Sequence, residues 1–348
     1  MKNITETINY LIKQKIHFAI YSLPNSDDIT LIVSENKNSN PQAGFAIQEF
    51  SMQKDTYYIA DDIVLQNEEI CVSRVEHCSD NRIDYELEKD ISYNVFSKNQ
   101  YEEYVSHCIK ECETERTKKI VPARIKAVEK VKNFNVGTYF LKLKKEYKSA
   151  FVNLYFHTFS GLWIGVTPEL LIKETLSKSF VTNSLAGTKL ISRNRDWTTK
   201  EKEEQQIVTD YIVNSLTNNA CNIENELKVK TIEAGLIQHL KTTIEFSSSQ
   251  NFNVLAKILH PTPAVCGMPL IKAYNFINKY EKKQRQCYTG FVGVNTKNDK
   301  QLYVNLRCMQ ILENKFLVYI GAGVTKDSIP EKEYLETENK SQTLLGLL

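Results

Sequence analysis

The spacing of apolar segments in the second half of the chain constrains the fold more than any other feature. The segments AFVNLYFHTF, GLWIGVTPELLIKE and SFVTNSLAGT follow one another from Ala150 with only a few polar or small residues between them. Runs rich in β-branched and aromatic residues are typical of strands. Because parallel strands need a crossover of about a dozen residues or more, breaks this short predict antiparallel pairing.

The same pattern extends over most of the chain. Apolar runs occur in the first hundred residues (HFAIYSL, ITLIVS, TYYIADDIVL) and near the C-terminus (YTGFVGVN, QLYVNLRCMQIL, KFLVYIGAGV). Helices are predicted at residues 98–116, along TTKEKEEQQIVTDYIVNSL from Thr198, and on both sides of HPTPAVCGMP. No linker or repeat interrupts the series, so we expect a single mixed domain of α/β (α+β) class over residues 1–348.

The composition excludes several kinds of partner. The chain has 348 residues, of which 42% are hydrophobic and 25% charged, and its net charge is +2. This balance indicates a soluble globular protein with no nucleic-acid or membrane partner. No apolar run is long enough to cross a bilayer, and MKNITETINYLIKQ predicts an amphipathic helix, not a signal peptide. We expect a cytoplasmic protein with reduced cysteines, and the sequence leaves its oligomeric state open, a monomer included.

One carboxylate stands out in the helix that begins near Thr198. The apolar residues Val208, Ile212 and Leu216 form a stripe at helical spacing, and this stripe extends back one turn to Glu204. If the first turn protrudes past the core, Glu204 simply complements the helix dipole. If the turn is buried, the charge needs a cation, because an unpaired buried charge is costly. The pattern alone leaves both interpretations open.

A second acidic stretch, EKEYLETENKSQ, lies in the last predicted helix. Ser328 and Glu331 have the spacing of a capping box, with Pro330 in the first turn. Glu336 and Lys340 have the spacing of a surface ion pair worth a few tenths of a kcal/mol, and Glu338 has no evident partner. Periodicity alone therefore favours a solvated helix face.

The turn before this helix points to another possibility. In YIGAGVT a strand runs into Gly321 and Gly323 and then toward the helix. Glycines allow a ligand to approach the backbone, and exposed amide groups bind anions. A strand, a GAG turn and an acidic helix could bind an anionic ligand through the turn and a hard cation through the carboxylates.

Taken together, nine short motifs resemble one family. KIVPAR, GVTPELL, SLAGT, EEQQIVTDYI, HPTPAVCGMP, YTGFVG, LRC, YIGAG and ETENK occur between about residues 119 and 345 in the order found in chorismate-utilising enzymes, and they most resemble the isochorismate synthase branch. The resemblance implies a large sandwich of two mostly antiparallel β-sheets with helices outside and a central active-site cleft. Residues 1–110 carry no matching motif and are assigned to the same sandwich as its strand-rich N-terminal part.

The resemblance also implies an isomerase reaction. Isochorismate synthases add water at one ring carbon of chorismate while the 4-hydroxyl two carbons away leaves, which requires a base and an acid. Carried over by motif, Lys119 is the base and Glu169 the acid. Lys119 would have to act without its proton near neutral pH, and Glu169 would need a pKa raised by burial.

The remaining site residues follow from the same resemblance. Mg²⁺ is expected on Glu204 and Glu336, with Glu333 as a further or outer ligand. Chorismate is a dicarboxylate, and the residues expected to bind it are Arg307, Lys340, Tyr288, Gly321, Gly323, Gly187, Thr188 and His239. For His239, a structural role in the core is nearly as consistent with the sequence as direct contact.

Departures from the family pattern keep alternatives open. Gln205 replaces a usual histidine but can still donate a hydrogen bond, so metal binding is expected to survive in a weaker form, and Pro122 is reminiscent of the anthranilate branch. Lys119 favours water over ammonia as nucleophile, and Ala186 argues against an aminodeoxychorismate synthase. Salicylate synthase, which goes on to eliminate pyruvate, is the nearest alternative. An anthranilate-type synthase and a non-catalytic dicarboxylate-binding protein are more distant ones. The motifs do not distinguish menaquinone from siderophore biosynthesis.

Overall fold

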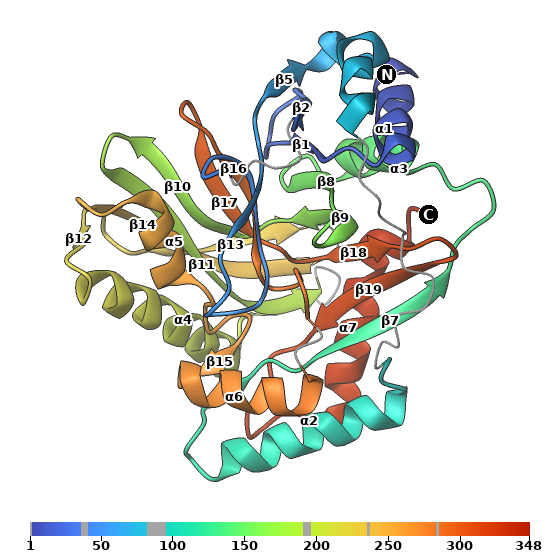
Figure 1. Cartoon of the computed structure of the whole chain (residues 1–348). Helices are drawn as coiled ribbons and strands as arrows, with labels where there is room; N and C mark the ends of the chain where they lie inside the picture. The colour runs from blue at the N-terminus through green and yellow to red at the C-terminus, as the bar shows by residue number, and fades with distance from the viewer. Residues whose placement is uncertain (1, 36–40, 82–94, 191–195, 235–236, 283–284) are drawn as a thin grey trace.

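Two large β-sheets packed face to face form the centre of the structure, a computed structural model (Figure 1). It describes residues 2–35, 41–81, 95–190, 196–234, 237–282 and 285–348. All strand pairs among these residues are antiparallel. The predicted sandwich of two antiparallel sheets with helices outside is therefore confirmed.

The first sheet has eight strands. In spatial order they are β5 (Ile63–Gln66), β2 (Thr30–Val33), β1 (Phe18–Ser22), β8 (Phe151–His157), β9 (Gly161–Thr167), β18 (Cys308–Ile311), β19 (Lys315–Gly321) and β7 (Ala123–Glu129). The sheet thus joins strands from the N-terminal, middle and C-terminal parts of the chain.

The second sheet has nine strands. In spatial order they are β12 (Asn222–Ile223), β14 (Ile237–Ser247), β11 (Ser179–Leu190), β10 (Leu170–Leu176), β17 (Lys300–Val304), β16 (Phe291–Asn295), β3 (Gly44–Gln48) and β4 (Tyr57–Ile59), while β13 (Val229–Ala234) also pairs with β14. A separate two-stranded ladder joins β6 (Lys119–Ile120) to β15 (Gly267–Met268).

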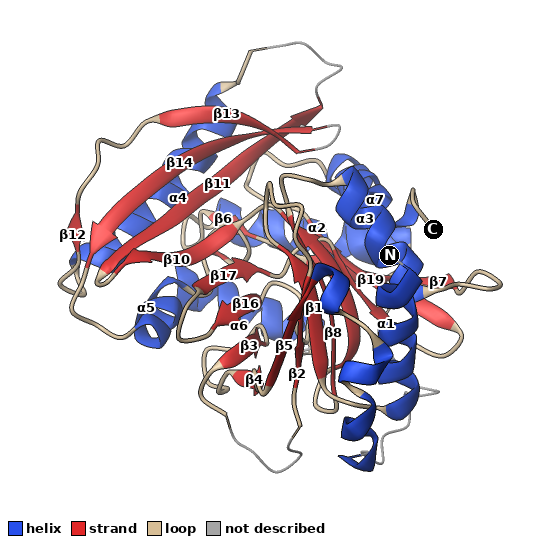
Figure 2. Cartoon of the chain, turned by 90° about the horizontal axis from the view of Figure 1, so that it is seen from above, coloured by secondary structure: helices blue, strands red, loops and turns tan. Residues whose placement is uncertain are grey.

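Seven α-helices cover the sheets in the described part of the chain. They are α1 (Lys2–Gln14), α2 (Lys98–Glu113), α3 (Val136–Glu146), α4 (Thr199–Thr217), α5 (Phe252–Leu259), α6 (Leu270–Glu281) and α7 (Pro330–Leu345). Figure 2 shows α1 and α3 side by side along the first sheet and α4 and α5 on the other side of the molecule, against the second sheet. The short 3₁₀ helices η1 (Asn67–Glu69), η2 (Val72–Arg74) and η3 (Glu76–Asn81) follow β5.

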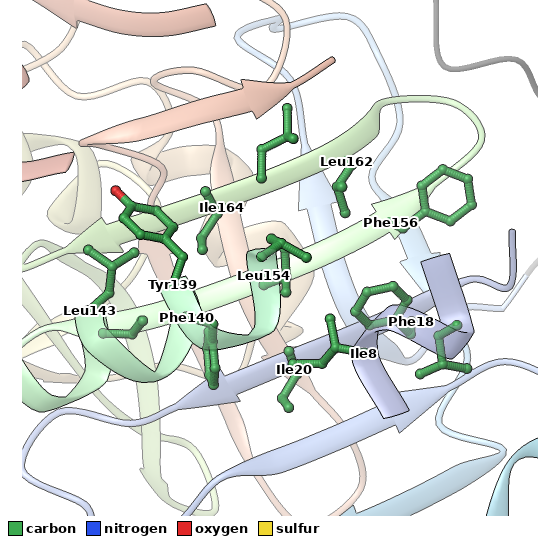
Figure 3. Close-up of a cluster of buried hydrophobic side chains, with 14 of the residues drawn as sticks. Ile8, Phe18, Ile20, Tyr139, Phe140, Leu143, Leu154, Phe156, Leu162 and Ile164 are labelled. Atoms are coloured by element: carbon green, nitrogen blue, oxygen red, sulfur yellow. The ribbon is translucent and has the colours of Figure 1, made fainter. Parts of the chain in front are cut away.

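Helices on the outer faces explain why the strands read as continuous apolar runs. Strand β9 is buried at every position, because its inner side chains pack between the sheets and its outer ones pack under helices. Between the sheets lie aromatic residues such as Phe45, Phe151 and Trp163. Figure 3 shows the outer layer, where Ile8 of α1 and Phe140 of α3 pack against strands of the first sheet.

Two connections carry the chain from one sheet to the other. Strand β9 of the first sheet continues through Pro168 and Glu169 into β10 of the second. Strand β17 of the second sheet returns through residues 305–307 to β18 of the first. Because β9 pairs with β18 and β10 pairs with β17, the two crossings lie side by side, and they bring Glu169 and Arg307 to one region.

The helices predicted from periodicity are confirmed, including those at residues 98–116, from Thr198 and on both sides of HPTPAVCGMP. The predicted capping box at Ser328 is wrong. Ile329 is the N-cap of α7 and Pro330 its first residue, while the hydroxyl of Ser328 accepts a hydrogen bond from the Thr325 amide. No helix in the described ranges combines the length and apolar character needed to span a membrane.

The N-terminal strands contribute to both sheets. Strand β1 pairs with β8 in the first sheet, and β3 pairs with β16 in the second. A chain that starts at Lys98 would lack five edge strands and leave β8 and β16 with unpaired backbone groups and uncovered apolar side chains.

This arrangement predicts that residues 98–348 do not fold alone. The fragment is expected to be insoluble or to lack a cooperative urea transition by circular dichroism, whereas the full chain unfolds in one transition. A fragment that unfolds cooperatively near the midpoint of the full chain would contradict a single unit over residues 1–348.

Candidate active site

A cavity of about 1030 Å³ opens between the sheet crossings, α4 and α7. Twelve of the thirteen residues predicted for the site line it: Lys119, Glu169, Gly187, Glu204, His239, Tyr288, Arg307, Gly321, Gly323, Glu333, Glu336 and Lys340. The thirteenth, Thr188, lies in β11 opposite His239, and its side chain is outside the described part. The structure therefore brings together side chains from seven separate segments of the sequence.

Lys119 is held at the wall of this cavity by hydrogen bonds on both sides of its strand. The Lys118 and Val121 amides donate to the carbonyls of Met268 and Cys266, and the Ile120 amide donates to Val324. The side chain of Lys119 is only 2% exposed, whereas that of Lys118 points to solvent. Its buried ammonium group therefore needs a counterion.

Glu204 supplies that counterion. Its Oε1 lies 2.5 Å from Nζ of Lys119, and its side chain is 22% exposed. The second turn of α4, which carries Glu204, is thus at the edge of the core, and of the two interpretations of Glu204 the one that requires a cation is correct. The pairing partner comes from a strand 85 residues earlier in the chain, which periodicity could not indicate.

A bulge in β11 brings α4 close to the cavity. The register of β11 against β14 shifts between Ala186 and Thr188, and Gly187 there has φ of +70°. A Cβ atom at Gly187 would lie 3.2 Å from the carbonyl oxygen of Glu201. Only glycine combines this backbone conformation with such a close approach at low cost.

The unusual residue Gln205 points away from the cavity into the second sheet. Its amide donates to the hydroxyls of Ser184 at 2.8 Å and Thr242 at 3.2 Å, and its side chain is fully buried. Gln205 therefore ties α4 to β11 and β14. Its effect on a metal bound at Glu204 would be indirect, through the placement of the helix.

Glu169 is buried at the crossing from β9 to β10. Its side chain is 4% exposed, and burial raises the pKa of its carboxyl group to about 8, although Lys119, Arg307 and Lys340 act in the opposite direction. At neutral pH the carboxyl group is therefore mostly protonated and can donate a proton. The raised pKa that was expected for Glu169 is present.

Arg307 and His239 contact each other across the second crossing. The guanidinium Nη2 of Arg307 lies 3.3 Å from Nε2 of His239, and the other ring nitrogen lies 3.1 Å from the Gly187 carbonyl. A carbonyl only accepts, so Nδ1 of His239 carries the proton and Nε2 accepts from Arg307. Burial and the neighbouring Arg307 lower the pKa of His239 to about 3, which keeps the imidazole neutral.

The GAG turn forms the wall next to Lys119. A Cβ atom at Gly323 would lie 3.0 Å from Oε1 of Glu204 and 3.0 Å from Cε of Lys119. A Cβ atom at Gly321 would lie 3.1 Å from the hydroxyl oxygen of Tyr288. Side chains at either position would crowd the groups that line the cavity, so the two glycines keep this wall at backbone level.

Helix α7 faces the cavity with Glu333, Glu336 and Lys340. Nζ of Lys340 lies 2.7 Å from Glu336 and 3.1 Å from the carbonyl oxygen of Gly321. The expected ion pair is therefore present, but it faces the cavity and the GAG turn.

On the same helix, the view of Glu338 as a solvated charge is wrong. Its carboxylate pairs with Arg124 and with Lys126 on β7, the latter at 2.6 Å. The side chain of Arg124 also donates to Thr337 at 2.8 Å and lies over the ring of Tyr334. These contacts fix α7 to the first sheet, and because they join distant segments, the helix periodicity gave no sign of them.

Several cavity residues were missed from the sequence, among them Tyr319 and Lys189. Tyr319 stands two positions before Gly321 on β19, so strand alternation places both on one face, and that signal was available. Lys189 directly follows the SLAGT motif and lies 4.6 Å from the ring centroid of Trp197. The sequence held no signal for that aromatic contact.

The donor set of the cavity fits a hard cation. Glu204, Glu333 and Glu336 offer only carboxylate oxygens, which Mg²⁺ prefers. Within the part of the chain that the structure describes, the three do not converge to within 4.8 Å of one another. Mg²⁺ often takes only one or two carboxylates and completes its shell with waters and substrate oxygens, so these residues suit the ion.

Comparison with known proteins identifies the family. The sequence profile of the chorismate binding enzymes matches residues 45–348. The chain belongs to the chorismate-binding enzyme family. The match includes every segment that lines the cavity, and it extends into the N-terminal strands, where no motif was recognised.

Relatives within the family have more than one activity. The chain is 32% identical over 198 residues to isochorismate synthase DhbC of Bacillus subtilis (strain 168), covering 52% of this chain and 49% of that protein. It is 28% identical over 227 residues to anthranilate synthase component 1 of Lactococcus lactis subsp. lactis (strain IL1403), covering 61% and 49%. The chain spans about half the length of the curated relatives that it matches.

Solved structures support the fold. DhbC of Bacillus anthracis superposes with a TM-score of 0.77 at 21% sequence identity, covering 99% of this chain and 98% of that one. At this identity the likeness concerns the fold alone, and it agrees with the two-sheet sandwich described above.

The raised pKa of Glu169 predicts a pH-dependent cost to stability. The folded state resists ionisation of this carboxyl group between its ordinary pKa of 4.5 and its folded value of about 8. Stability is therefore lost as the pH rises through that range. Glu169→Gln removes the penalty and is expected to gain on the order of 3 kcal/mol over wild type between pH 4 and pH 7.

Urea denaturation at pH 4 and pH 7 measures this difference. Glu103→Gln, which changes an exposed residue of α2, is the matched control and should track wild type at both values. If Glu169→Gln also tracks wild type, the carboxyl group ionises freely in the folded protein.

Proposed function

We propose that this protein is an isochorismate synthase, an isomerase that converts chorismate to isochorismate with Mg²⁺. The observation that carries the proposal is the pair of buried groups on one cavity, Lys119 and the protonated Glu169. Water addition with loss of a hydroxyl group needs a base and an acid. A chain of the chorismate-binding family that holds both groups has the functional groups for this reaction.

The proposed step moves two protons. Lys119, once its ammonium group has given up its proton, accepts a proton from water as the water oxygen bonds to a ring carbon, and the ring double bonds shift. The carboxyl group of Glu169 donates its proton to the departing 4-hydroxyl, which leaves as water. One water enters and one leaves, so the product is an isomer of the substrate. Burial of Glu169 suits it to the acid role.

Cationic and amide groups around the cavity would bind the two carboxylates of chorismate. Arg307 and Lys340 supply positive charge, and Arg307 can bind a carboxylate in a bidentate manner. The backbone at Gly321 and Gly323, together with Tyr288, would face the enolpyruvyl side.

The ring of chorismate would lie against Gly187, Thr188 and His239. Because His239 is neutral and accepts from Arg307, it would also help to orient that guanidinium group. This contact combines the two roles that the sequence left open for His239.

Mg²⁺ would be held by Glu204 and Glu336, with Glu333 as an additional or outer ligand. When bound, the ion would neutralise a substrate carboxylate. Glu204 and Glu336 each pair with a lysine, Lys119 and Lys340 respectively, so the lysines keep both carboxylates oriented along the cavity wall.

The cytoplasmic location expected from the sequence stays a prediction.

Two other activities compete with this proposal. A salicylate synthase would form isochorismate and then eliminate pyruvate. An anthranilate-type enzyme would use ammonia, and a relative with that name matches at similar identity. Lys119 in the KIVPAR motif favours water, because the ammonia-using branch resembles this motif with glutamine at that position.

The first prediction from this function concerns the product. Purified protein incubated with chorismate and Mg²⁺ is expected to form isochorismate without releasing pyruvate, as measured by liquid chromatography and a lactate dehydrogenase assay. Removal of Mg²⁺ with a chelator is expected to abolish turnover. Salicylate with equimolar pyruvate would favour the salicylate synthase, and no turnover of chorismate would refute both.

The second prediction concerns the acid and the base. Lys119→Ala and Glu169→Gln are each expected to lower kcat by about 10²- to 10⁴-fold while the circular dichroism spectrum is retained. Lys118→Ala, which changes the exposed neighbour, is the matched control and should keep wild-type kcat. Wild-type kcat is also expected to fall above about pH 8, as Glu169 loses its proton. Near-normal activity of either variant would contradict the assignment.

A further inference from the structure

A buried ion pair lies behind the wall of the cavity that carries Lys119. Glu281 is the last residue of α6, and Arg285 follows after the helix has ended at Lys282, whose φ is +51°. Nε of Arg285 lies 2.6 Å from Oε2 of Glu281, and Nη2 lies 2.8 Å from Oε1. The side chains are 3% and 5% exposed, so the bidentate pair is shielded from solvent.

The remaining donors of Arg285 hold the cavity wall. Its Nη1 donates to the carbonyl of Val265 at 2.9 Å and to the hydroxyl of Thr289 at 3.3 Å, and Nη2 donates to the carbonyl of Val121. With the two bonds to Glu281, all five guanidinium N–H groups are used. Val121, Val265 and Thr289 all line the cavity, so one side chain ties three of its wall segments together.

Glu281 binds the backbone of the same segment, residues 121–123. Its Oε1 also accepts from the Ala123 amide at 2.8 Å and from the Tyr104 hydroxyl at 3.1 Å. Between Val121 and Ala123 the chain passes from the β6–β15 ladder to β7 of the first sheet, and Pro122 has no N–H. Residues 321–324 pair with one side of this junction, where Ala322 donates to the Pro122 carbonyl and Val324 to the Ile120 carbonyl. The ion pair satisfies the Val121 carbonyl and the Ala123 amide, which this pairing leaves out.

This junction lies two residues from Lys119. Lys119 pairs with Met268 in the ladder with β15, and the Val121 amide donates to the Cys266 carbonyl. Arg285 binds the carbonyls of Val121, which follows β6, and Val265, which precedes β15. It therefore fixes the separation of the two chain segments just beyond the ladder and the lysine. The ring of Phe50, 4.4 Å from the guanidinium carbon, packs against Arg285 and limits its movement.

We propose that Glu281 and Arg285 are a positioning pair for Lys119, the base in the proposed function on which this inference rests. Buried ion pairs often add little net stability compared with apolar residues, so stability alone gives no reason for this one. Its hydrogen bonds instead set the backbone from which the lysine reaches Glu204 and the cavity. Loss of the pair should displace the amine and leave the carboxylate-binding groups on the other segments in place.

Arg285→Lys tests the proposal. The variant keeps the positive charge beside Glu281 but cannot reach Val121, Val265 and Thr289 at once. Since a displacement of about 1 Å can cost about 10²-fold in rate, kcat per folded molecule is expected to fall about 100-fold, with KM for chorismate within about threefold of wild type. Steady-state kinetics and circular dichroism at the same temperature measure both quantities.

A second readout separates positioning from a general structural role. If Arg285 acts through Lys119, the two changes are not additive, and Arg285→Lys should lower the residual kcat of Lys119→Ala by less than about threefold. Ile8→Ala, in the distant core under α1, is the matched control, expected to lower the melting temperature without changing kcat at a temperature where it stays folded.

Three outcomes would overturn the inference. They are a near-normal kcat in Arg285→Lys, a KM that rises in step with the loss of kcat, and a full 100-fold further loss in the Lys119→Ala background. If Arg285→Lys does not fold, the double variant Glu281→Gln/Arg285→Gln leaves no unpaired charge and should give the same split between kcat and KM. A wild-type protein that does not convert chorismate would refute the proposed function, and that result is distinct from all three.

Discussion

The site depends on two chain crossings that are hydrogen-bonded to each other between the sheets. The Thr167 hydroxyl donates to the Val304 carbonyl at 2.6 Å, and the Val304 amide donates to the Glu169 carbonyl at 3.0 Å. The Val166 amide donates to the backbone carbonyl of Arg307 at 3.1 Å. A strand that leaves its sheet loses its ladder partners, and here each crossing supplies partners to the other. The two functional side chains therefore project from backbone that is hydrogen-bonded from one crossing to the other.

The carboxyl groups of the cavity lie in different environments. Glu169 is buried, and its ionised form is disfavoured even with three cations nearby. Glu204, at the rim, is in direct contact with a lysine. Glu169 lies at a chain crossing between the sheets, whereas Glu204 lies in the second turn of α4 and is 22% exposed.

The sheets, the helices and most of the cavity residues could be predicted from the sequence, but from different kinds of evidence. Apolar runs and short breaks are local signals, and they were sufficient for the strands and for α2, α4 and α7. The cavity residues came from resemblance, because periodicity had favoured a solvated face for Glu336 and Lys340. Glu338 and Arg285 bind groups in distant segments of the chain. The local spacing of charged and apolar residues does not indicate which distant segment a side chain will contact in the fold. Ser328 matched a capping motif, yet the helix begins at Pro330, one residue later than the motif implies.

The placement of the N-terminal strands has a consequence for how the protein forms in the cell. Strand β3 completes the second sheet beside β16, which is made only when almost the whole chain has left the ribosome. Until then β3 and β4 can pair only with each other, and non-local pairing of the kind that joins β3 to β16 is slow. The emerging chain must therefore keep these segments from associating wrongly for most of its synthesis. Chaperone binding during translation would act on this N-terminal part of the chain.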